Sequence, residues 1–303
     1  MLLKYLPSAR LFEKGLIRFT QPGALNDPDD ARPEILVDAY APEDYAASQE
    51  RALAAGIPFQ SMEDLEALYL APFPSGRFDE KSFPRLWPAR EPRLRTEPFS
   101  TLEEFDRALA ERAIELCLAW ADASIGILSL SVSTDETMWA YYAGDHSGMA
   151  VGFDDKHPFF ANDVRPVTYA NDPVCVSSNL GMIHIGGVQW NREDILNRKV
   201  RAIPRDLLFR KRSKWKHESE WRILAELSRA NSILGKDATG YPVHLFEIPG
   251  DAVTTLTFGY RASDDLIQET LKQISKLGWG HLAVSRRQRS KTGRIREEHI
   301  GRI

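Results

Sequence analysis

The order of apolar and polar residues along the chain predicts strands in succession, with helices inserted between them. Residues 2–30, "LLKYLPSARLFEKGLIRFTQPGALNDPDD", have the pattern of a strand, a short helix, a second strand and a turn-rich loop. Residues 125–133, "IGILSLSVS", alternate strictly, with serines on one face and leucines on the other. Further strands are expected at residues 149–154, 164–170, 220–227, 241–249, 252–260 and 281–287. We expect 220–227 to pair with 241–249, and 281–287 to be the last strand.

Helical patterns lie between these strands. Residues 100–124 form the clearest helix, because Ser100 and Glu103 have the spacing of a capping box and the apolar residues that follow lie along one broad stripe. Start and stop signals predict further helices at 41–56, 61–72, 135–148, 190–204 and 263–278.

Together these elements indicate an α+β fold. We expect a mixed, mostly antiparallel sheet with flanking helices, and a split sheet is an open alternative. Residues 35–122 are rich in alanine, glutamate, leucine and proline and interrupt the run of strands. The sequence therefore predicts a single α+β domain over residues 1–303, with 35–122 as a mainly helical insertion within it.

Composition is that of an ordinary soluble protein. The 303 residues are 43% hydrophobic and 27% charged, and the formal net charge is -4. No stretch approaches the roughly 20 apolar residues of a membrane span, and the first residues lack a signal-peptide pattern. Cys117 and Cys175 are too few and too far apart for a disulfide framework. We expect a cytoplasmic protein with no membrane partner.

Several classes of enzyme are disfavoured by their missing motifs. The sequence has no His-Glu-x-x-His, no Cys-x-x-Cys, no phosphate-binding loop and no Gly-x-Ser-x-Gly. The glycine-rich dinucleotide fingerprint is also missing. We therefore predict no metal, and we expect that any NAD is bound by another kind of site.

The charged stretch "HESEWRIL", residues 217–224, is the strongest candidate for chemistry. Read as a strand, it places Glu218, Glu220 and Arg222 on one face, opposite a core face with Trp221 and Ile223. A carboxylate held rigidly on a strand suits a residue that meets a developing positive charge, so Glu220 and Glu218 are the candidate catalytic residues. The alternative is a Glu–Arg pair that only fixes the register of two strands.

Two polar groups elsewhere are candidates for binding a ligand. Asn26 and Asp27 precede Pro28, where they either line a cleft or build a turn. Ser129 and Ser131 share one face of a predicted strand, although serine is a poor strand former. They either donate hydrogen bonds to a nucleotide or face solvent.

Aromatic residues in "MWAYYAGDHSG", residues 138–148, are candidates for stacking. Trp139 and Tyr142 could stack on a base or a nicotinamide ring. They are also three positions apart, so the alternative is that they form the inner face of a short helix.

Two basic tracts, residues 198–216 and 286–296, stand out in an acidic chain. Such runs are usually solvated faces. Two of them in one chain also suit a surface that binds the phosphate groups of a nucleotide or a nucleic acid. A nucleic acid or a protein that accepts a transferred group is therefore a possible partner of these tracts.

Three stretches resemble, in order, a bacterial family catalogued as domain of unknown function 2971. They are "LLKYLP…GLIRFTQPGALNDP", "ILSLSVSTDETMWAYYAGDHSGMAVGFD" and "RSKWKHESEWRIL". The resemblance covers most of the chain outside the expected helical insertion, and the family name implies no activity.

A looser resemblance connects the chain with ADP-ribosyltransferases. In that fold NAD, as co-substrate, lies across a split antiparallel sheet, and a basic residue of the first strand holds the adenosine ribose. The resemblance implies that Lys4, followed by Tyr5, takes this place, although Lys4 stands where those enzymes have histidine or arginine.

The same resemblance assigns the reacting end of the site. It implies that Tyr141 or Tyr142 stacks on the nicotinamide, and that Glu220 acts at the bond to be cleaved, with Glu218 two positions earlier. Arg222, on the same predicted face, would bind within the site and hold Glu220 ionised. Cleavage of the nicotinamide–ribose bond passes through an oxocarbenium-like state, which a fixed carboxylate stabilises.

Three hypotheses follow from the sequence. The first is an NAD-consuming, ADP-ribosyltransferase-like enzyme, with a bacterial toxin or an antiphage defence effector as its biological setting. The second is a defence protein that binds or cleaves nucleic acid through the basic tracts. The third is a non-catalytic interaction protein in which Glu218, Glu220 and Arg222 are structural.

Overall fold

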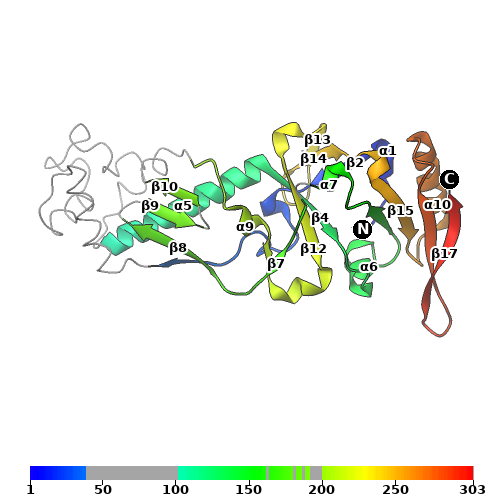
Figure 1. Cartoon of the computed structure of the whole chain (residues 1–303), viewed down its shortest axis with the longest axis horizontal. Coiled ribbons are helices and arrows are strands. Elements are labelled where there is room, and N and C mark those ends of the chain that lie inside the picture. The colour runs from blue at the N-terminus through cyan, green and yellow to red at the C-terminus, as the bar shows by residue number, and fades with distance from the viewer. Residues whose placement is uncertain (39–101, 162–163, 180–181, 186–187, 192–199, 303) are drawn as a thin grey trace, which may run out of the picture. The chain divides into compact units, whose positions relative to one another are not determined.

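The computed structural model describes residues 1–38, 102–161, 164–179, 182–185, 188–191 and 200–302 (Figure 1). The chain divides into two compact units. Unit 1 comprises Met1–Ala31, Ser124–Asn171 and Phe209–Ile303, and unit 2 comprises Arg32–Ala123 and Asp172–Leu208. Most of the predicted insertion, including the helices expected at 41–56 and 61–72, lies outside the described residues. The single domain over 1–303 stays a prediction.

Unit 1 is built on a large sheet. Among the described residues, eight strands lie in the order β17-β16-β15-β5-β1-β4-β12-β6. They are β1 (Leu2–Leu6), β4 (Ile125–Ser131), β5 (Met149–Phe153), β6 (Arg165–Pro166), β12 (Glu220–Glu226), β15 (Val253–Phe258), β16 (Ala283–Arg289) and β17 (Ile295–Arg302). Neighbours are antiparallel, except that β15 and β16 run parallel. The predicted α+β fold with a mixed, mostly antiparallel sheet is therefore confirmed.

This sheet divides between β1 and β4. The two strands pair at Leu3 and Ser131, whereas β1 pairs with β5 and β4 pairs with β12 along their lengths. At its other end β4 bridges to Thr20 through Ile127. Thr20 follows β2 (Leu16–Phe19), which forms a three-stranded sheet with β13 (Ser232–Lys236) and β14 (Pro242–Glu247) in the order β13-β14-β2. Strand β4 therefore connects two sheets.

The main core covers one face of the large sheet. Leu128 and Leu130 of β4 belong to it, as the alternation of this stretch predicts, and so does Ile223 of β12. Helices and strands that contribute side chains to this core include α1 (Arg10–Lys14), α7 (Pro158–Ala161), α10 (Asp264–Lys276), β2 and β14. Ser263 caps α10, its side chain accepting a hydrogen bond from the Leu266 amide.

Helix α6 (Glu136–Tyr142) lies on the opposite face of the sheet. Asp135 caps it by accepting a hydrogen bond from the Thr137 amide. Its Met138 and Trp139 pack in a separate cluster with Leu3 and Tyr5 of β1, Ala150 of β5, and Ala143, which directly follows α6. A single short helix thus covers part of this face, and polar residues of β4 and β12 lie on the same side.

Unit 2 contains α5 (Leu102–Ser124), whose last residue already belongs to unit 1. Among its described residues, unit 2 also contains a four-stranded sheet in the order β10-β9-β8-β3. Its strands are β3 (Ile35–Asp38), β8 (Val174–Asn179), β9 (Met182–Ile185) and β10 (Val188–Asn191), and α9 (Arg205–Leu208) follows. The helix expected over 190–204 is wrong at both ends, because Trp190 and Asn191 pair in β10 and residues 200–204 are not helical. Residues 192–199 lie outside the described part.

Three further expectations need correction. Strand β14 pairs with β13 and β2, not with β12, because β12 is enclosed by β4 and β6. The last strand is β17 rather than 281–287, which corresponds to β16. Residues 164–170 form two short strands, β6 and β7 (Thr168–Tyr169), and β7 pairs with β11 (Arg210–Lys211).

The described residues also contain short 3-10 turns. They are η1 (Pro22–Ala24), η3 (Ser213–Glu218), η4 (Leu227–Arg229) and η5 (Gly250–Ala252).

Candidate functional site

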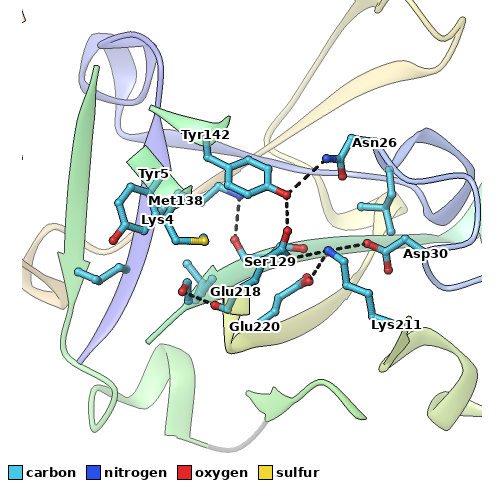
Figure 2. A pocket seen from close by; sticks show the side chains of 14 residues that line it. Lys4, Tyr5, Asn26, Asp30, Ser129, Met138, Tyr142, Lys211, Glu218 and Glu220 are labelled. Atoms are coloured by element: carbon cyan, nitrogen blue, oxygen red, sulfur yellow. Dashed lines mark hydrogen bonds and ion pairs between the residues drawn. The ribbon is translucent and has the colours of Figure 1, made fainter. Parts of the chain in front are cut away.

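One pocket of unit 1 brings together residues from distant parts of the sequence (Figure 2). It is lined by Leu3, Lys4, Tyr5, Leu25, Asn26, Asp30, Ser129, Leu130, Ser131, Met138, Tyr142, Lys211, Glu218 and Glu220. Eight of the residues that the sequence singles out are in this lining. Most of the candidate catalytic and ligand-binding residues therefore lie together, although they come from three separate stretches of the chain, 3–30, 129–142 and 211–220.

The floor of the pocket is formed by three adjacent strands. Leu3 of β1 pairs with Ser131 of β4, and Ser131 in turn pairs with Glu220 of β12. Because directly paired residues point to the same face of a sheet, these three side chains share the face on which α6 lies. Lys4 Nζ donates a hydrogen bond to the Ser129 carbonyl at 2.8 Å, across the split between β1 and β4.

A buried network of charges forms one wall. Lys211 Nζ lies 3.0 Å from Asp30 Oδ2, 2.6 Å from Glu218 Oε2 and 2.9 Å from Glu220 Oε2. Arg222 Nε lies 2.7 Å from Glu220 Oε1, and its Nη2 also pairs with Asp30. All five residues are at most 5% exposed, and Arg222 is fully buried. Figure 2 shows the Lys211 amine between Glu220 and Asp30.

This network determines the charge state of Glu220. Burial alone would raise its pKa, but Arg222 and Lys211, together with a hydrogen bond from Ser129, lower it to about 2. The same pairing works in the other direction for the cations. Burial would lower the pKa of Lys211, and the three carboxylates raise it instead. Glu220 is therefore a fixed anion at neutral pH.

Lys4 has the opposite balance. Burial lowers its pKa from 10.5 to about 8, although Glu220 partly offsets the effect. The residue is half-buried and lines the pocket. At pH 7 its ammonium adds a third cation near the three carboxylates, and a modest rise in pH removes that charge.

Glu218 reaches the pocket by a different route from the predicted one. It ends η3 rather than lying in β12, and Ser219 adopts a left-handed conformation with φ 43° between them. The expected alternation of one continuous strand is therefore wrong at this residue. The carboxylate nevertheless faces Glu220 across Lys211, and Ser131 Oγ donates to the Glu218 carbonyl at 2.5 Å.

Tyr142 closes the pocket from the side of α6. Its hydroxyl donates a hydrogen bond to Glu218 Oε1, and Asn26 Nδ2 lies 3.5 Å from the same hydroxyl (Figure 2). Burial, and then the neighbouring Glu218, raise the pKa of Tyr142, so the phenol stays protonated. Asn26 is exposed, and it therefore marks the mouth of the pocket.

Three predicted binding residues are outside the pocket lining. Arg222 lies behind Glu220, where it contacts no open space. Asp27 accepts a hydrogen bond from Trp215 Nε1 and pairs with Lys214. Trp139 is 4% exposed and packs edge-on against Tyr5, 5.3 Å between ring centres, as the inner-face alternative predicted.

Sequence reasoning missed Lys211 and Asp30. Lys211 was counted only as one charge in a basic tract, and Asp30 as part of a turn-rich loop. Lys211 lies seven residues before Glu218, in a stretch where Trp215 is the only apolar residue. Nothing local indicates that both side chains are buried together.

Several basic side chains of the two tracts form ion pairs within unit 1. Within residues 198–216, Arg212 lies 3.0 Å from Asp29 and Lys214 lies 3.3 Å from Asp27. Within residues 286–296, Arg286 pairs with Asp264 at 3.0 Å, and Arg287 pairs with Glu136. The side chains of Arg212 and Lys214 remain about half exposed.

Two features are missing from the described residues. No described helix is long and apolar enough to cross a membrane. In the same part of the chain, no group of three or more histidine, cysteine, aspartate or glutamate side chains has an arrangement that could hold a metal ion. Where three carboxylates do converge, the Lys211 ammonium occupies the centre.

Comparison with known proteins identifies one family. Residues 138–223 match the model of the family described as Protein of unknown function (DUF2971), which confirms the predicted resemblance over that segment. The matched segment contains α6, β5 to β11, η3 and the start of β12, and so it includes Tyr142, Lys211, Glu218 and Glu220. No curated protein and no solved structure matches the chain.

Proposed function

We propose that this chain is an NAD-consuming enzyme of the ADP-ribosyltransferase type. One observation carries the proposal. Lys4, Ser129 and Glu220 come from β1, β4 and β12, which are adjacent strands, and all three line one pocket at the point where the sheet divides. The resemblance predicted this convergence for a first-strand cation, a serine-bearing strand and a late-strand glutamate. Residues in unrelated structural positions would be scattered over the surface.

The proposed reaction transfers ADP-ribose from NAD to an acceptor. The bond between ribose C1′ and the nicotinamide nitrogen breaks, and its electron pair goes to that nitrogen, which neutralises the pyridinium ring. A lone pair of the acceptor forms the new bond at C1′, and the acceptor loses a proton. Positive charge develops on the ribose as the first bond breaks, so a fixed negative charge nearby lowers the barrier.

Glu220 supplies that charge in our proposal. It is anchored by Arg222 and Lys211 and stays ionised because its pKa is about 2. It is therefore suited to electrostatic stabilisation and is a weak proton acceptor. Glu218 already accepts a hydrogen bond from the Tyr142 hydroxyl. We propose that Glu218 takes up the proton that the acceptor loses, because a hydroxyl of the acceptor could replace the Tyr142 hydroxyl as its hydrogen-bond donor.

The remaining lining residues would orient NAD. Lys4 would hold the adenosine ribose, with Tyr5 beside it on β1, and Ser129 and Ser131 offer hydroxyls on the floor. Tyr142 presents a ring for the nicotinamide half, next to Asn26. A bacterial toxin or antiphage defence effector is the biological setting that we propose for such an activity.

The experiment measures nicotinamide released from NAD by the purified chain, with and without nucleic-acid and protein acceptors. Glu220→Gln should abolish release. Glu226→Gln is the matched control, because Glu226 is exposed at the far end of the same strand. Melting curves of both variants separate loss of activity from loss of folding.

Two outcomes would count against the proposal. Wild-type protein that releases no nicotinamide with any acceptor removes its basis. A Glu220→Gln variant that melts at a lower temperature while turnover per folded molecule is unchanged favours a structural network instead.

A further inference from the structure

A row of three aromatic rings, Tyr142, Tyr141 and Trp215, leads outward from the pocket, and only Tyr142 belongs to the pocket lining. Tyr141 is 64% exposed, the largest exposed fraction among the large hydrophobic side chains of the described residues. Its ring lies 6.3 Å from that of Tyr142 and 6.4 Å from that of Trp215, edge-on in both cases. Tyr142 belongs to the pocket lining, so the row begins inside the pocket and continues outward.

Trp215 is held in place from several sides. Its indole N–H donates to Asp27, which is buried and adjacent in sequence to Asn26 at the mouth. Lys211 Nζ and Lys214 Nζ lie 5.4 Å and 5.5 Å from the centre of its ring. A half-buried tryptophan fixed in this way gives a rigid support for Tyr141, whose own ring is exposed to solvent.

Charge is distributed unequally between the pocket and this rim. Inside the pocket and its wall, Asp30, Glu218 and Glu220 balance Lys211 and Arg222, with Lys4 as the third cation. The interior therefore has no surplus positive charge for a phosphate. The rim carries Arg212 and Lys214, which are about half exposed and pair with Asp29 and Asp27, and Lys216, which is also exposed.

We propose that this aromatic row, Tyr141 with Trp215 behind it, binds a nucleobase of a single-stranded nucleic acid. An unpaired base stacks on Tyr141, and the adjoining phosphates lie against Lys214, Lys216 and Arg212. A planar surface flanked by cations is the combination that holds single strands without base pairing. A protein acceptor would not need an open ring face beside a cationic rim, and a duplex keeps its bases stacked inside.

Only the role of the bound strand rests on the proposed function, in which the strand would be the acceptor of ADP-ribose. Binding itself requires no NAD. The test uses a fluorescein-labelled single-stranded oligonucleotide and a duplex of the same sequence, with anisotropy as the readout. Nicotinamide release is measured separately in the same preparations.

The single strand should bind more tightly than the duplex. Tyr141→Ala should weaken single-strand binding by roughly 5- to 150-fold, the range for loss of one stacked base, while Tyr141→Phe keeps it. The dependence of affinity on salt should have a log–log slope of about −2 if three cations contact phosphates. Lys214→Glu should make that slope shallower.

Leu234→Ala is the control, because Leu234 is also an exposed large apolar residue, on β13 and outside the pocket lining. It should bind as the wild type does. The inference is overturned if neither strand binds, if duplex and single strand bind alike and Tyr141→Ala changes nothing, or if nicotinamide release is stimulated only by protein. Tyr141-dependent binding without any nicotinamide release would support this inference and remove the proposed reaction.

Discussion

Replacing Lys211 with methionine would remove the ammonium that three buried carboxylates share. Methionine keeps the length and flexibility of the side chain, so the packing changes little. Asp30, Glu218 and Glu220 would then face one another with Arg222 as the nearest remaining cation. Glu218 would lose its ion pair with Lys211, and Asp30 and Glu220 would share Arg222, in a region that is at most 5% exposed.

Removing one partner from a buried ion pair typically destabilises a protein by about 3–5 kcal/mol. Lys211 is one of two cations that lower the pKa of Glu220, and Arg222, which has the larger effect, remains in the variant. We therefore expect Lys211→Met to reduce the free energy of unfolding of unit 1 by about 3 kcal/mol at pH 7.

The loss should depend on pH in a defined direction. In the variant, at least one of the three carboxyls would have a folded-state pKa above its unfolded value, and would bind a proton on folding. Stability then decreases as pH rises through that pKa. The difference between the variant and the wild type should be largest at pH 8 and smaller at pH 5.

Urea unfolding followed by tryptophan fluorescence at pH 5, 6, 7 and 8 measures this difference. Lys236→Met is the matched control, because Lys236 is exposed on β13 and should change stability by less than about 0.5 kcal/mol. The reasoning is refuted if Lys211→Met is as stable as the wild type, or if its loss of stability is the same at pH 5 and pH 8.

Three further predictions concern the surroundings of the site. A Cβ at Gly259 would lie 2.0 Å from the His146 carbonyl oxygen, so Gly259→Ala should cost about 2 kcal/mol in urea unfolding, and an unchanged midpoint would show that this loop yields freely. Asp135→Ala should cost about 1 kcal/mol through loss of the α6 cap on the Thr137 amide, whereas Asp135→Ser should retain most of it; equal melting temperatures for the two would contradict this. In the wild type, Glu220 should contribute stability in full above pH 4.5 and lose it as pH falls toward 2, and Glu220→Gln should flatten acid unfolding in that window.

Local patterns were sufficient for the elements of unit 1 that depend on neighbouring residues. The alternation of 125–133 gives β4 and its buried face of Leu128 and Leu130, because the two faces of a strand differ every second residue. The cap and stripe of 263–278 give α10. The same reasoning failed at Glu218, because Ser219 has a left-handed conformation and separates Glu218 from β12, which begins at Glu220.

Strand order and pairing were not readable in this way. The sequence offered β14 as the partner of β12, but β12 lies between β4 and β6, because its apolar face is buried against the main core and its edges are both occupied. Similarly, the division of 164–170 into two short strands and the additional strand at 295–302 carry no strong local signal.

The sequence by itself therefore determined which residue types were available to the site: a first-strand lysine, alternating serines, paired tyrosines and two glutamates. Only the tertiary structure decided that they share one pocket, and that Lys211 and Asp30 belong with them. The physical reason is that a charge becomes buried only where an opposite charge meets it. The partners of Lys211 and Arg222 come from the first and the last segment of unit 1, at Asp30 and at Glu220, so their meeting depends on the order of strands and not on any local pattern.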